Sequence, residues 1–333
     1  HLSQQQDDQE RQRLDEIKEG LTESQRQFIL KQSHQLTERQ AHEEDLSVLP
    51  SVTLADIPEA VTYPEPLGSK TITRYGASCN GLVYHQIVTE LGGLEDAQWQ
   101  VLPLLGQLIG ELGSGGRDYL ATQVVQHAIT GGLSAYSSLR NCLDDRHQQR
   151  AFFVLGSRAL QRNAVPMVDL LKQTLETVRF DELDRMTELV RQILARREMG
   201  VTGQGHSLAM LAASAWFSPV AALNHRLSGL AGLEHLKSLD LALQKSGSAD
   251  LAGQLQGLHE LLLNSAKVPL LISDADISAS LHDVLLQRWE NRPELKGSRI
   301  RLVGGSTSPD TVYLTNTQVN FCAQAYAAVP VSD

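Results

Sequence analysis

Two histidine–glutamate pairs open like a zinc-binding helix, in which two histidines one turn apart bind the metal and a glutamate activates water. They are His42-Glu43 and His259-Glu260, but Leu46 and Leu263 stand where the second histidine of an H-E-x-x-H motif belongs. The inverted order, H-x-x-E-H, is not found around any of the eleven histidines. The sequence therefore predicts no catalytic residue, no metal ligand and no cofactor bound by this chain, and it leaves the substrate-binding residues unknown.

Two glycine-rich strings contain residues that could cradle a phosphate, Gly203-Gln204-Gly205-His206 and Gly304-Gly305-Ser306-Thr307. Neither follows a predicted strand and opens a helix with the complete phosphate-loop pattern, so a turn and a linker are predicted instead. His206 has no acidic or cysteine neighbour at metal-ligand spacing, which favours a helix start or a packing role. Asp144-Asp145-Arg146-His147 reads as a charged loop, and the chain has no G-x-S-x-G elbow that would supply a nucleophilic serine.

The three cysteines, Cys79, Cys142 and Cys322, are odd in number and far apart. This spacing fits neither a disulfide framework nor a metal knuckle. We interpret them as small core residues of a reduced chain, as expected in the cytoplasm or an organelle matrix. Cys79 precedes Asn80-Gly81 in a predicted turn and is expected to be the most exposed of the three.

Composition favours a protein with a substantial core and argues against nucleic-acid binding. The 333 residues are 41% apolar, enough for one large or two ordinary domains, and no apolar run approaches the length of a membrane span. The net charge is −10, and residues 1–45 hold eleven acids and six bases. Nucleic-acid binding needs a basic surface, whereas an acidic surface suits cationic peptides.

Residues 1–45 are predicted to form a helical hairpin. Leu14, Ile17 and Leu21 recur at spacings of three and four, and Gly20 supplies a helix end. Thr22-Glu23-Ser24-Gln25 has the pattern of a capping box at the start of a second helix, which should run to about His42. That helix is expected to bury three apolar side chains, Phe28, Ile29 and Leu36.

Beyond Leu46 the patterns alternate between strands and helices. The predicted strands are 71–75, 81–88, 133–139, 151–160 and 268–272, the first two as an antiparallel pair around a turn at 77–81. Pro103 should bend or break the first helix, and Ser273 or Asp276 should cap the last. The predicted helices are 94–113, 117–129, 165–178, 181–197, 206–216, 219–226, 232–244, 250–264 and 276–289. This order indicates an α+β fold, with an antiparallel sheet in one layer and helices on one of its faces.

Residues 291–316 read as a linker, because Pro, Gly, Ser and Lys accumulate there. A single strand is predicted over 317–328, with no later strand to pair with it.

Several strings along the chain resemble, in the same order, the insulinase (pitrilysin) zinc metallopeptidases, in particular the presequence-protease branch. Each string is weak alone, but their collinear order makes the match specific. The strings are Leu46-Ser47-Val48-Leu49-Pro50, Asp56-Ile57-Pro58, Asn80-Gly81-Leu82-Val83-Tyr84, Leu102-Pro103-Leu104-Leu105, Thr130-Gly131-Gly132-Leu133-Ser134, Gly156-Ser157-Arg158-Ala159-Leu160, Gly205-His206-Ser207-Leu208-Ala209 and Thr317-Gln318-Val319-Asn320-Phe321.

The resemblance implies an internal, noncatalytic piece of such a peptidase. It implies a hairpin linker at 1–45, a noncatalytic α+β domain at 46–290, a linker at 291–316 and the first strand of a following domain at 317–333. Zinc and the catalytic residues would then lie in an N-terminal catalytic half of the same polypeptide. The implied partners are that half, a C-terminal domain and unfolded peptide substrates, with no nucleic acid and no membrane.

A second class of function stays open at this point. The chain could be a stand-alone interaction scaffold, in which the acidic hairpin docks a partner helix and the domain takes no part in catalysis. The reading frame on either side of the chain would distinguish the two, because an upstream H-x-x-E-H supports the peptidase.

Overall fold

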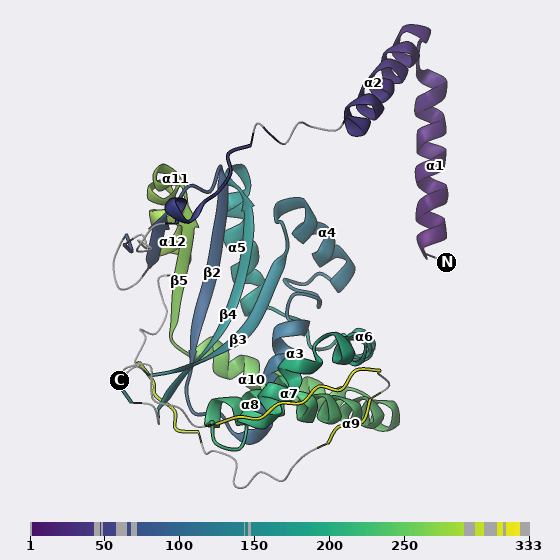
Figure 1. Ribbon diagram of the computed structural model, residues 1–333. Coiled ribbons are helices and arrows are strands. Elements are labelled where there is room, and N and C mark those ends of the chain that lie inside the picture. The colour runs from purple at the N-terminus through teal and green to yellow at the C-terminus, as the bar shows by residue number, and fades with distance from the viewer. Residues whose placement is uncertain are drawn as a thin grey trace. The chain divides into compact units, whose positions relative to one another are not determined.

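The computed structural model describes residues 2–42, 47, 49–57, 65–67, 72–142, 144–145, 148–289, 297–302, 312–315 and 318–326 (Figure 1). The chain separates into two compact units, His1–Thr62 and Tyr63–Asp333. The residues of the main hydrophobic core all belong to the second unit.

The first unit contains the predicted hairpin. Helix α1 spans Leu2–Gly20 and α2 spans Glu23–Ala41, and a short 3₁₀ turn, η2, covers Leu54–Asp56. The predicted capping box is confirmed. The Gln25 backbone N–H donates to the Thr22 hydroxyl at 3.4 Å, and the Thr22 N–H donates to the Gln25 side-chain oxygen at 2.9 Å. The helix start was predictable because both partners lie within four residues.

The expected burial on α2 is wrong. Phe28, Ile29 and Leu36 are 61%, 48% and 58% exposed, and no described residue of α2 is buried. Two helices alone form a single layer, and burying a helix face requires a second layer to cover it. Within its own unit the hairpin therefore leaves its apolar side chains in contact with solvent.

The second unit is built on a five-stranded sheet with the order β1-β5-β2-β4-β3 (Figure 1). Its strands are β1 Thr73–Gly76, β2 Leu82–Leu91, β3 Leu133–Asn141, β4 Gln149–Leu160 and β5 Lys267–Ser273. The expected antiparallel pairing of the first two strands is wrong, because β5 lies between them. Strand β1 runs parallel to β5, with Thr73 opposite Leu270, so the sheet is mixed. The α+β class itself is confirmed.

Alternation along the strands buries one face of the sheet. On β2, Val83, His85 and Ile87 are at most 1% exposed, whereas the intervening Tyr84 is 37% exposed. Helix α3 contacts β3 and α5 contacts β4, so the helices cover the buried side. Successive strand residues point to opposite faces, and this period of two explains the pattern. The expectation of helices on one face is therefore confirmed.

The helical layer follows the predicted order with shifted ends. Helix α3 continues through Pro103 without a break, and the helix expected over 276–289 is instead two short helices that meet at Leu281. A 3₁₀ turn, η3, spans Gln161–Asn163. The helices are α3 Asp96–Leu108, α4 Tyr119–Ile129, α5 Ala164–Glu176, α6 Leu183–Gly203, α7 Gly205–Ser214, α8 Pro219–Ser228, α9 Leu230–Ser246, α10 Ala249–Asn264, α11 Ala275–Ser280 and α12 His282–Arg288. In the described part of the chain, no helix has both the length and the apolar character needed to cross a membrane.

Asp274 joins the two ends of the sheet that are far apart in sequence. Its carboxylate accepts the backbone N–H of Gly81 at 2.8 Å and that of Cys79 at 2.9 Å, which fixes the turn before β2. These hydrogen bonds hold the pKa of Asp274 below its usual value. Asp274 is also the residue before α11, so neither Ser273 nor Asp276 is the cap.

Two further expectations do not hold. Cys79 and Cys142 are only partly buried and Cys322 is exposed, so none of them is a core residue. Residues 318–326 form no strand, because an extended segment needs a pairing partner and the described residues provide none. Of the predicted linker, residues 297–302 are described. There Ile300 exchanges two backbone hydrogen bonds with Gln149, at 2.8 and 2.9 Å.

Candidate functional site

The histidines do not converge on a metal site. No group of three or more His, Cys, Asp or Glu that could hold a metal ion occurs within the described ranges. His259 is buried and its Nε2 lies 2.6 Å from the Leu175 carbonyl oxygen, whereas the adjacent Glu260 is exposed. The other candidate pair cannot be placed, because Glu43 lies outside the described residues. These side chains do not fit zinc, and no chemical step is assigned to it on this chain.

His85 is the most enclosed titratable group near the sheet. It is fully buried, and its Nδ1 lies 3.0 Å from the Leu270 carbonyl oxygen. Its ring centroid is 6.2 Å from that of Trp289. Burial lowers the pKa of His85 to about 4, because the charged imidazolium would lose its hydration. A neutral histidine sealed under the helices is a packing residue.

The Gly203–His206 string joins two helices. Helix α6 ends at Gly203 and α7 begins at Gly205, so no strand precedes it and the predicted turn is confirmed. At Gly205 a Cβ atom would lie 2.3 Å from the Phe321 ring, so only glycine allows this close approach. His206 lies in the first turn of α7 and is exposed, as a helix-start role requires. The second glycine-rich string, 304–307, lies outside the described residues.

The sheet has a second, open face, which we define by Tyr84 and Val88 of β2 and the residues in register with them. Its side chains are partly exposed on each of the five strands (Figure 1), where α5 lies behind the strands in this view. They are mostly apolar or aromatic. Besides Tyr84 and Val88, they include Tyr75, Tyr136, Phe152, Val268, Leu270 and Ile272.

The charged groups of the open face are mainly basic. Arg150 pairs with the buried Glu90 at 3.0 Å, and its guanidinium lies 5.0 Å from the centre of the Phe152 ring. Arg140 and Arg158 are exposed on the same face. Three arginines and one glutamate give this surface a positive charge. The acidic character expected of a peptide-binding surface is therefore absent from the open face as the described residues form it.

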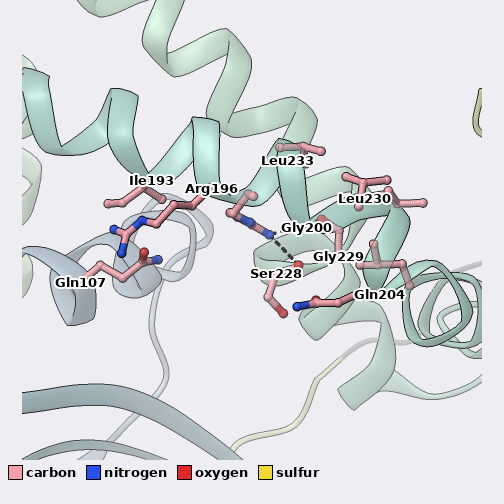
Figure 2. A pocket seen from close by; sticks show the side chains of 12 residues that line it. Gln107, Ile193, Arg196, Gly200, Gln204, Ser228, Gly229, Leu230 and Leu233 are labelled. Carbon is pink, nitrogen blue, oxygen red and sulfur yellow. Dashed lines mark hydrogen bonds between the residues drawn. The ribbon is translucent and has the colours of Figure 1, made fainter. Parts of the chain in front are cut away.

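A cleft of about 270 Å³ lies among the helices, where α6 passes the junction of α8 and α9 (Figure 2). Its polar lining comes from Gln107, Arg196, Arg197, Gln204 and Ser228. Its apolar lining comes from Ile193, Val201, Leu208, Leu230 and Leu233. No Asp or Glu is among the described residues that line it. The cleft thus combines apolar walls with two cationic side chains.

Two features shape the cleft. Arg197 donates to the Ser228 carbonyl oxygen at 2.5 Å and reaches that of Gly229 at 3.4 Å, which binds α6 to the end of α8. Partial burial lowers the pKa of Arg197 from its ordinary value. At Gly232 a Cβ atom would lie 2.5 Å from the Leu227 carbonyl oxygen, so the tight α8–α9 turn requires glycine.

Sequence patterns alone do not single out this cleft. The pair Arg196-Arg197 near the end of a predicted helix is the available signal, together with Gly229 between two predicted helices. Neither pattern shows that the two segments meet, because helix crossing depends on packing between residues distant in sequence.

An α+β domain with helices on one face of its sheet, and without a described metal-ligand cluster, defines a binding or structural class of domain. Residues 1–239 match the model of the domain family associated with the C subfamily of M16 peptidases. Because this match covers more than half of the chain, the chain belongs to that family. The resemblance inferred from the sequence strings is therefore confirmed.

Individual relatives support the same relationship. The mitochondrial presequence protease of Debaryomyces hansenii is 26% identical over 249 residues, which are 72% of this chain and 23% of that protein. Presequence protease 1, chloroplastic/mitochondrial, of Arabidopsis thaliana is 24% identical over 324 residues, covering 94% of this chain and 30% of that protein. The chain thus spans between 23% and 30% of the length of these two relatives.

Among solved structures, a peptidase M16 inactive domain from Pseudomonas fluorescens aligns with a TM-score of 0.41 at 14% identity. The alignment covers 74% of this chain and 53% of that one.

Proposed function

We propose that this chain is a noncatalytic part of a presequence-protease-like zinc metalloendopeptidase, forming wall and hinge of a chamber that degrades unfolded peptides. The observation that carries this proposal is the family match over residues 1–239, together with relatives named presequence protease. Zinc and the catalytic residues belong, in this proposal, to an N-terminal catalytic half of the same polypeptide.

The proposed division of labour follows from what peptide hydrolysis needs. It requires a metal-activated water, a general base and donors for the oxyanion. In this proposal the described residues contribute surface and enclosure instead. Hairpin linker 1–45, noncatalytic domain 46–290, linker 291–316 and the start of a following domain at 317–333 are the limits that we propose.

The open face is the surface that we assign to the chamber. It is broad, it is mostly apolar, and its side chains are only partly buried. Extended, unfolded peptides expose apolar side chains that folded proteins bury, so such a surface favours unfolded substrates. Enclosure would raise the local concentration of these peptides and exclude folded proteins by size.

A scaffold that docks a partner helix remains the second candidate, because one observation favours it. The hairpin leaves apolar side chains such as Leu14, Ile17 and Phe28 about half exposed or more, at 52%, 48% and 61%. An amphipathic helix with an uncovered apolar face is a common docking element for another helix.

Three proteins compared in one assay test the proposal. A cationic, presequence-like peptide is incubated with this chain, with the full-length protein and with a full-length version lacking 46–290. We expect cleavage only by the full-length protein. Cleavage by this chain alone in the presence of a chelator would contradict the noncatalytic assignment. Undiminished cleavage by the deletion variant would show that the wall is dispensable and would favour the scaffold.

A further inference from the structure

The cleft between α6 and the α8–α9 junction has unused hydrogen-bond donors. Arg196 is exposed and has no hydrogen bond or ion pair with any described residue. Arg197 uses only its Nη2 atom on the Ser228 and Gly229 carbonyls, which leaves Nε and Nη1 without a protein acceptor in the described part of the chain. Two neighbouring guanidinium groups therefore offer N–H donors in the geometry that suits a carboxylate.

The start of α9 adds to this positive character. Gly229, its N-cap residue, provides no side-chain hydrogen bond, and the first hydrogen bond of the helix runs from the Leu233 N–H to the Gly229 carbonyl at 3.1 Å. The preceding amides, including that of Leu230, have no partner within the described residues. Free amides at the positive end of a helix favour an anion. Gly229 and Leu230 both line the cleft (Figure 2).

The apolar walls restrict which anion fits. Ile193, Leu208 and Leu233 line the same volume of about 270 Å³, which is larger than a bare inorganic anion needs. A fully hydrated anion gains nothing from an apolar wall, whereas an apolar group bonded to a carboxylate would leave water there. No described acidic side chain lines the cleft to repel the carboxylate.

We propose that this cleft binds a carboxylate attached to an apolar group, as at the C-terminus of a peptide that ends in an apolar residue or in a small organic acid. Arg196 and Arg197 bind the carboxylate, and the side chains around Leu233 contact the apolar group. This site goes beyond the proposed function and does not depend on it, since binding is measured on this chain without any peptidase activity.

Calorimetric titration of the full chain tests the proposal with matched ligands. N-acetylleucine should bind with one-to-one stoichiometry, and N-acetylleucinamide, which lacks the charge, should bind at least about tenfold more weakly. Inorganic phosphate should bind more weakly than N-acetylleucine because it lacks the apolar group. An acetylated hexapeptide ending in leucine separates the two sources: tighter binding of the hexapeptide identifies a peptide C-terminus, and equal binding shows that a small acid suffices.

A variant pair on one helix provides the control. Arg196→Gln should weaken N-acetylleucine binding about tenfold to a hundredfold, as expected for loss of a charge-assisted hydrogen bond. Arg191→Gln should leave it unchanged, because Arg191 pairs with Asp240 at 3.6 Å and does not line the cleft. Both positions are exposed, so both variants should fold. Equal binding of acid and amide, equal effects of the two variants, phosphate binding as tight as N-acetylleucine, or no binding at millimolar ligand would each overturn the proposal.

Discussion

The two faces of the sheet carry the same strands but have different physical roles. On β4, Phe153 points to the helical layer and is 0% exposed, whereas Phe152, the preceding residue, lies on the open face beside Arg150. The covered face is uniform in chemistry and sealed, and the open face mixes tyrosines, aliphatic side chains and arginines. The difference shows that the covered face determines stability, whereas the open face remains available for a ligand.

The largest expected effect compares these adjacent phenylalanines. Phe153→Ala should lower the free energy of unfolding by about 3–5 kcal/mol, since it leaves a cavity in a packed core. Phe152→Ala should lower it by only about 1 kcal/mol, because the side chain already contacts solvent. Urea denaturation of both variants measures the two values. Equal losses would show that the open face is covered in solution.

The second prediction concerns acid stability and His85. The folded-state pKa of about 4 lies below the ordinary value of 6.5, so between these pH values the unfolded chain binds a proton that the folded chain does not. The free energy of unfolding should therefore fall by up to about 3 kcal/mol as pH decreases from 6.5 to 4, with no such loss above pH 6.5.

His85→Gln should remove much of this pH dependence. The matched control is His206→Gln, which replaces an exposed histidine and should leave the slope unchanged. Urea titrations at several pH values between 4 and 7 provide the comparison. An unchanged slope in His85→Gln would mean that other groups control the acid response.

A smaller effect is expected for the ion pair on the open face. Arg150→Met keeps the aliphatic stem over Phe152 but removes the charge opposite Glu90, whose side chain is 2% exposed. We expect a loss of about 1–2 kcal/mol, less than for a fully buried pair, because Arg150 itself is 37% exposed. A double-mutant cycle with Glu90→Gln isolates the coupling, and a coupling near zero would contradict this assignment.

The smallest stability effect is predicted at Tyr136, which is 47% exposed on β3. Tyr136→Ser should change the free energy of unfolding by less than about 0.5–1 kcal/mol. The same change should reduce capture of an unfolded peptide in the full-length protein, seen as a higher KM. If KM is unchanged while stability falls by several kcal/mol, Tyr136 supports the fold and does not contact substrate.

Sequence patterns predicted the local elements well because their causes are local. The capping box at Thr22 and the alternation of Val83 to Ile87 depend on neighbours within a few residues. The β1–β2 pairing was wrong because the strand that separates them arrives much later, and an apolar strand such as Val268–Ile272 does not state its position in the sheet. Pairing between strands distant in sequence, together with packing in the core, decides that order.

The candidate cleft was missed for a related reason. Arg196 and Arg197 are visible in the sequence as a basic pair, but that pattern usually indicates a solvated helix face. Their role becomes apparent only once Arg197 is seen to contact the carbonyls at the end of α8. The crossing of α6 with the α8–α9 junction depends on side-chain packing that sequence periodicity does not encode.

The position of β5 has a consequence for how the domain forms during synthesis. Cys79 and its partner Asp274 are separated by 195 residues, and β5, which ends at Ser273, supplies the pairing strand for both β1 and β2. On the ribosome, β1 therefore waits without this partner while the long helical segment is made. The sheet can close only after residue 273 has emerged, so the strand between β1 and β2 is the last one added. A nascent chain arrested before β5 should expose strand edges that a chaperone would have to shield.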